Sequence, residues 1–405
     1  MILQSHLFSR YYYLLIGLAV FSLPFTALLY FFITPLLLIL WIVEGDWKRK
    51  WNRLAESHTL ILAGSLILFW LINIIGLFYS NDLVRGVMRT YDKLPFLVYP
   101  LVFFTLDNAF FTKERLYHLF KLFICATTIM LLICWGNAII NFSSTGKTIY
   151  FYYTFFSQIF GHPAYCALTV CIALCISFYF FSNTLKKYRW IWVILFFFFT
   201  VSIYFLQSRS GILVLIFILI VSSFYYLHIR KKNYWYGIGG ILIVLAFTFT
   251  LTKLFPNRAG NYVKKMTVEQ LYPQKMLGLR SEIWKITCQI TKEHKILGIG
   301  TGYHNEHYLS DTDAVVINKN PSFINAHNQY LQTLLEHGIL GFSILGFLIL
   351  YSVFHAVKNK NYFLLILLII FGINMFFESM LEHNKGIFAF SLFVCLFVFG
   401  EKMRT

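Results

Sequence analysis

One histidine and two arginines are the residues of this sequence best suited to chemistry, because each stands beside an apolar segment. His327 follows Asn325 by two positions, and Leu331, Leu334 and Leu335 then recur at helical spacing. We therefore expect a helix with Asn325 as its N-cap and His327 in its first turn. The helix dipole would disfavour the imidazolium there and leave a neutral ring able to accept a proton, as a general base must. A histidine that only caps the helix is the alternative.

The two arginines are candidate ligands for a phosphate group. Arg209 lies in a short polar break between two apolar segments. A guanidinium beside hydrocarbon is costly, so it usually serves a ligand or a pathway, or else it snorkels to the surface. Arg280 is expected to open a short amphipathic helix with Ile283, Ile286 and Ile290 on its apolar face. Its planar fork and the helix N-terminus would together bind an anion, whereas an exposed ion pair with a nearby glutamate is the alternative.

A second group of polar residues is expected to support this chemistry, namely His162, Arg89, Asn328 and Tyr330. Asn328 and Tyr330 follow His327 closely, whereas His162 and Arg89 could equally anchor the chain at a membrane interface. His304 and His307 suggest a zinc site with His327, but the residues around them give no helix that would bring two imidazoles to one face. We therefore expect no metal.

The composition is typical of an all-α polytopic membrane protein. Hydrophobic residues make up 59% of the 405 and charged residues only 13%, against about 25% charged in soluble domains. Apolar runs of about 17 to 25 residues recur along the chain, each long enough to cross about 30 Å of hydrocarbon. We expect about twelve transmembrane helices, nine in residues 1–254 and three in residues 337–405. Residues 255–336 would form one large, mainly helical loop domain.

Charge sets the expected topology. The formal net charge of +17 comes from short basic clusters that separate the apolar runs, and this spacing indicates cytoplasmic loops rather than a nucleic-acid surface. Both termini would then be cytoplasmic, and the loop domain at 255–336 would face the opposite side of the membrane, with membrane lipids around the helices.

Five motifs taken in order resemble the O-antigen ligase and polymerase superfamily. The resemblance is specific over roughly residues 155 to 345. The motifs are Ser208 to Gly211, Arg280 to Trp284, Leu297 to Gly300, His327 to Leu331 and Glu336 to Gly341.

This resemblance implies a bundle of about a dozen helices in the bacterial inner membrane, with a periplasmic domain and an active site on the periplasmic side. It implies an enzyme that moves a glycan from undecaprenyl pyrophosphate to an acceptor, without a metal or a nucleotide cofactor. Arg209 and Arg280 would hold the donor pyrophosphate, and His327 would activate the acceptor hydroxyl.

The residue types agree with those implied roles. Arginines stabilise the charge that develops on a pyrophosphate leaving group, and one base acting with displacement from the opposite face would invert the anomeric centre. Retention would need a carboxylate nucleophile, and the outer loop offers no obvious pair. We therefore expect a metal-independent inverting glycosyltransferase.

The acceptor and the exact activity are open at this point. The favoured function is O-antigen ligation to lipid A core, in lipopolysaccharide biosynthesis. A polysaccharide polymerase and a protein O-oligosaccharyltransferase of the same superfamily are the alternatives. A transporter of lipid-linked sugars belongs to another class, and such proteins tend to carry internal repeats, of which the sequence shows no clear case.

Overall fold

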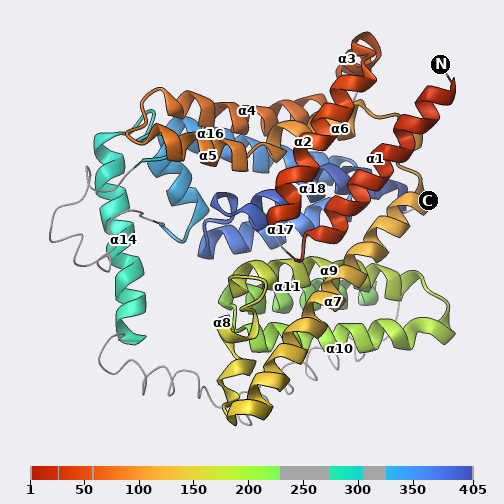
Figure 1. The fold of residues 1–405 in the computed structure, drawn as a ribbon, viewed down its shortest axis with the longest axis vertical. Coiled ribbons are helices and arrows are strands. Elements are labelled where there is room, and N and C mark those ends of the chain that lie inside the picture. The colour runs from red at the N-terminus through yellow and green to blue at the C-terminus, as the bar shows by residue number, and fades with distance from the viewer. Residues whose placement is uncertain (1, 26, 57–58, 229–272, 304–324, 404–405) are drawn as a thin grey trace. The chain divides into compact units, whose positions relative to one another are not determined.

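The computed structural model describes residues 2–25, 27–56, 59–228, 273–303 and 325–403, and every regular element in these ranges is a helix (Figure 1). The chain divides into two compact units. The first comprises Met1–Ala126 and Leu279–Thr405, and the second comprises Thr127–Gly278. We describe each unit by itself.

The first unit holds most of the candidate site. Its helices are α1 (Ile2–Ser22), α2 (Ala27–Glu44), α3 (Trp47–Glu56), α4 (Leu60–Leu77), α5 (Leu83–Asp92), α6 (Pro95–Thr105), α16 (Gln329–Lys358), α17 (Tyr362–Phe377) and α18 (Asn384–Val398), with the short 3-10 helix η5 (Met380–Glu382). Helix α7 (Lys113–Thr145) starts in this unit and continues into the second, and α14 (Pro273–Glu293) ends in it. The second unit also contains α8 (Tyr153–Phe156), α9 (Pro163–Asn183), α10 (Arg189–Leu206) and α11 (Arg209–His228).

The structure is that of a polytopic membrane protein. Five helices among the described residues are long and apolar enough to cross a membrane, and α2 with α3, bent by 111° at their junction, would make a sixth. These five are α4, α7, α9, α16 and the segment Lys186–Leu206 that contains α10. Shorter apolar helices occur in α1, α11, α17 and α18. Of the range 1–254, in which nine helices are expected, the part from residue 229 on lies outside the described residues, so the total of about twelve stays a prediction.

Helix α16 is broken at Gly338, whose backbone has φ 59° and ψ −157°. A glycine-rich turn at residues 295–301 lies against the break and replaces the hydrogen bonds that the helix loses. The replacing bonds run from Ile299 N to Leu335 O (3.0 Å), from Gly300 N to Glu336 O (2.9 Å), from Ile339 N to Lys295 O (2.8 Å) and from Leu340 N to Ile296 O (3.3 Å). The predicted boundary between residues 336 and 337 falls next to this break.

Glycine is required on both sides of this contact. Gly298 has φ 70°, and a Cβ on it would lie 2.5 Å from the backbone of Glu336. A Cβ on Gly338 would collide with the carbonyl of Ile296. Alternating glycines in a sequence are typical of a tight loop or of a close approach of backbones, and here they allow the close approach.

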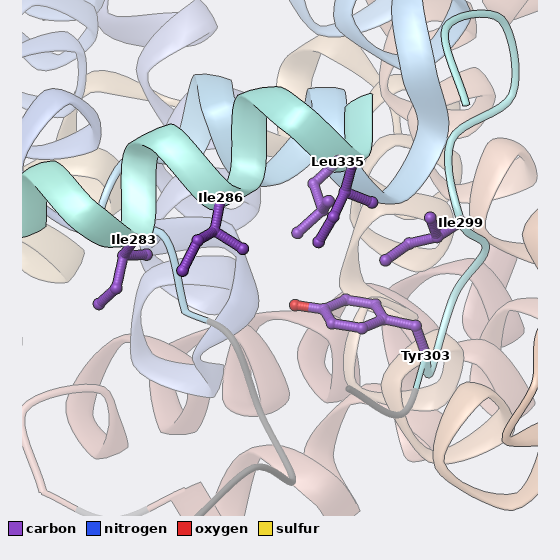
Figure 2. Close-up of a cluster of buried hydrophobic side chains, with 6 residues drawn as sticks. Ile283, Ile286, Ile299, Tyr303 and Leu335 are labelled. Atoms are coloured by element: carbon purple, nitrogen blue, oxygen red, sulfur yellow. The ribbon is translucent and has the colours of Figure 1, made fainter. Parts of the chain in front are cut away.

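Helix α14 packs its apolar face onto the same turn. Ile283, Ile286 and Ile290 form a buried cluster with Ile299, Tyr303 and Leu335 (Figure 2). This confirms the predicted amphipathic helix. The helix begins at Pro273 and not at Arg280, so the expectation that the helix N-terminus would bind an anion beside Arg280 is wrong.

Candidate functional site

His327 lies just before α16, and not in its first turn as predicted. The helix begins at Gln329, and its N-cap is Asn328, whose side-chain oxygen accepts hydrogen bonds from the N–H groups of Tyr330 (3.0 Å) and Leu331 (3.1 Å). His327 itself has a left-handed backbone, with φ 45°. The prediction that the helix dipole acts on an imidazole inside the first turn is therefore wrong.

The turn that carries His327 is held from several sides. The side-chain oxygen of Asn325 accepts from the backbone N–H of His327 and from the hydroxyl of Ser379, both at 2.8 Å. The indole N–H of Trp284 donates to the carbonyl of Ala326 at 2.7 Å. A left-handed conformation costs a non-glycine residue on the order of 1 kcal/mol or more, and it persists where surrounding contacts fix it. These contacts fix the position of the imidazole.

The carboxylate of Glu378 joins His327 to Arg280. Its Oε2 lies 2.8 Å from His327 Nδ1, and its Oε1 lies 3.2 Å from Arg280 Nη2. Arg280 Nη1 also donates to the carbonyl of Phe377 at 3.3 Å. The Glu378 side chain is only 11% exposed, whereas those of His327 and Arg280 are 35% and 33% exposed. The imidazole and the guanidinium therefore face outward and the carboxylate lies behind them.

This arrangement suits a general base next to an anion site. An ionised carboxylate only accepts hydrogen bonds, so the pairing places the imidazole proton on Nδ1 and leaves Nε2 as the nitrogen able to take a proton. The same carboxylate balances the charge of the imidazolium that would form. Arg280 pairs with Glu378, the residue that follows α17, and not with a glutamate of its own helix as the alternative supposed.

Four buried charges lie next to this site. Arg89 Nη1 is 2.7 Å from Glu336 Oε1, and Lys93 Nζ is 2.9 Å from Glu382 Oε1. Their side chains are between 0% and 16% exposed. Burial, together with the Glu336 carboxylate, raises the pKa of Glu382. Buried charges persist only when they are paired, and the two cations here match the two carboxylates.

Two glutamines connect the four charges to the start of α16. Gln329 donates to Glu382 Oε1 at 3.2 Å, and Gln332 donates to Glu336 Oε1 at 2.8 Å. The side-chain oxygen of Gln332 also accepts from the N–H of Ala326, one residue before His327, at 2.9 Å. Arg89, predicted as a supporting residue, therefore belongs to the network that holds the turn.

The remaining predicted residues have separate places. Tyr330 donates its hydroxyl to the carbonyl of Gly372 in α17, at 3.5 Å. In the second unit, Arg209 is the exposed first residue of α11. His162 is the N-cap of α9, where its Nδ1 accepts from the N–H of Ala164 at 3.3 Å. A capping role accounts for the position of His162.

The sequence contained a signal for Glu378 that we did not use. Glu378 and Glu382 stand four residues apart directly after an apolar segment. A carboxylate at the edge of the hydrocarbon region is unfavourable in free energy. Such residues therefore mark functional sites more often than not.

Comparison with known proteins agrees with the resemblance seen in the sequence. A family model described as O-Antigen ligase matches residues 193–346, a range that includes Arg209, Arg280 and His327. An uncharacterized protein of Haemophilus influenzae is 33% identical over 134 residues, which cover 30% of this chain and 34% of that protein. The match thus spans about a third of the relative's length. Residues 193–346 of this chain carry a domain of the O-antigen ligase family.

Proposed function

We propose that this protein is a membrane glycosyltransferase that moves a glycan from undecaprenyl pyrophosphate to an acceptor hydroxyl. The acceptor that we propose is lipid A core, and the reaction site is on the periplasmic face of the bacterial inner membrane. The carboxylate of Glu378, bonded at once to His327 and Arg280, carries this proposal. In this proposal, the carboxylate holds the imidazole that acts as the base next to the guanidinium that binds phosphate.

The reaction is a single displacement. The acceptor oxygen attacks the anomeric carbon while His327 Nε2 takes the hydroxyl proton. The bond from that carbon to the pyrophosphate oxygen breaks, and undecaprenyl pyrophosphate leaves with the electron pair. Arg280 stabilises the charge on the leaving group, and Glu378 stabilises the imidazolium. Arg209 is a second donor-binding cation by resemblance, and this role is tested with the Arg209→Ala variant.

Inversion of the anomeric centre follows from this assignment. Retention would use a carboxylate as nucleophile. Glu378 is the carboxylate beside His327, but both of its oxygens are engaged and its side chain is 11% exposed. It therefore suits the positioning of His327 better than attack on a sugar. We propose that the reaction needs no metal, because guanidinium groups bind the pyrophosphate and balance its charge.

The test is a transfer assay with purified full-length protein, a lipid-linked glycan as donor and lipid A core as acceptor. His327→Ala should lose about 10² to 10⁴-fold in rate, as expected for a general base, while it still binds the donor. A loss of less than about tenfold would favour a purely structural histidine. Chelator should leave the wild type active. Transfer only to a second lipid-linked glycan or to a protein would indicate the other members of the superfamily.

A further inference from the structure

A hollow of about 710 Å³ lies at the C-terminal end of α14, within the first unit. Its wall consists of the last turn of this helix, the turn that follows it, and one side chain that follows α4. The lining residues are Tyr79 and residues 292–299. The hollow contains none of the residues assigned above to the base or to the donor.

The wall of the hollow combines cations with exposed apolar side chains. Lys292 and Lys295 are exposed and three positions apart, and Glu293 is the carboxylate among the lining residues. Ile296 is 70% exposed and Leu297 is 43% exposed. A surface of this kind matches an amphiphile that carries both a phosphate and a hydrocarbon part.

The hollow lies at the same end of the helices as the candidate site. Figure 1 shows α14 crosswise at one end of α4 and α16. Arg280 is near the middle of α14 and Lys292 is in its last turn. At about 1.5 Å per residue, the two positions are separated by roughly 18 Å along the helix. A glycan of several sugar units would extend over that distance.

We infer that the hollow binds the phosphorylated, lipid-bearing end of the acceptor, with the phosphate on Lys292 and Lys295 and the lipid along Ile296 and Leu297. The acceptor glycan then follows α14 and presents its terminal hydroxyl to His327. This inference rests on the proposed function and names the acceptor class as a phosphorylated glycolipid. It assigns the two lysines to acceptor binding, away from the donor.

Lysines near the end of a helix also stabilise it through the helix dipole, so the test must separate binding from folding. The variant is Lys292→Gln combined with Lys295→Gln. The matched control is Lys285→Gln, an exposed lysine of the same helix that does not line the hollow. Thermal stability is measured for all three proteins.

The assay compares lipid A core with the same glycolipid after its phosphate monoesters have been removed. In the wild type, removal of the phosphates should raise the KM for the acceptor by at least about tenfold and leave kcat nearly unchanged. The double variant should raise the KM for the phosphorylated acceptor by roughly 25-fold, at about fivefold for each lysine. It should also lose the preference for phosphate, and Lys285→Gln should behave as the wild type.

The outcomes distinguish this inference from the proposed function. Normal transfer with no effect of the phosphates or the lysines overturns the acceptor site and leaves the transferase intact. Lower thermal stability of the double variant with an unchanged KM also overturns it, in favour of a helix-stabilising role. Loss of the preference for the phosphorylated acceptor in millimolar inorganic phosphate would show a plain anion site and would also overturn the inference. No transfer to any acceptor by the wild type would refute the proposed function itself.

Discussion

Replacement of Glu378 by glutamine tests the assignment of the base most directly. Glutamine keeps the size of the side chain but removes the charge that faces His327 Nδ1 at 2.8 Å. Its amide can also donate to Nδ1, which would move the ring proton to Nε2 and leave no acceptor for the substrate hydroxyl. A hydrogen bond to a charged group contributes about 1.5 to 3 kcal/mol, which corresponds to roughly a ten- to hundredfold loss in kcat.

A double-mutant cycle shows whether Glu378 acts through His327. Initial transfer rates are measured for Glu378→Gln, His327→Ala and the combination, with Glu114→Gln as a control at an exposed glutamate of α7. If Glu378 works by orienting the imidazole, its replacement should have little further effect once the imidazole is absent. Equal losses in both backgrounds, or a Glu378→Gln rate within about threefold of wild type, would refute this reasoning.

Three further outcomes follow from the structure. Arg280→Lys keeps the charge but loses the planar fork, so kcat/KM for the donor should fall at least about tenfold in the transfer assay, and Arg280→Ala should lower it further. Gly338→Ala should lower stability by roughly 2 to 4 kcal/mol in thermal unfolding, because its backbone is left-handed and the new methyl meets Ile296. Gly346→Ala in the same helix, where a Cβ meets nothing within 4 Å, should be neutral or slightly stabilising. Burial raises the pKa of Asp92 to about 6, so the folded protein retains a proton that the unfolded chain loses near pH 4. Stability should therefore fall as the pH rises from about 4 to about 6, and Asp92→Asn should flatten this part of the profile.

Local patterns in the sequence predicted the features that depend on neighbouring residues. The spacing of Ile283, Ile286 and Ile290 predicted the buried face of α14, and the glycines near Gly298 indicated either a tight loop or the close contact of backbones that is found. Both follow from periodicity and from the steric freedom of glycine.

The start of α16 could not be predicted with the same certainty, because two asparagines compete to cap it. Asn325 and Asn328 are equally good caps by residue type. Contacts of Asn325 with Ser379, 54 positions away, help to decide between them. The ion pairs are more distant still, since Arg89 and Glu336 are 247 positions apart. Sequence spacing carries no information about such pairs.

The broken helix α16 has a consequence for the way this chain enters the membrane. A segment that leaves the translocon normally forms all of its backbone hydrogen bonds within itself. Each N–H or C=O group left without a hydrogen bond in lipid costs several kcal/mol. Helix α16 cannot meet this condition alone, because four of its backbone groups around Gly338 bond to the turn at 295–301. That turn is synthesised earlier, and the N–H of Thr301 bonds to the carbonyl of Gly76 in α4 at 3.2 Å. We therefore expect α16 to insert as a partner of residues 295–301 and α4, so that the helix following His327 is completed only in an assembled bundle.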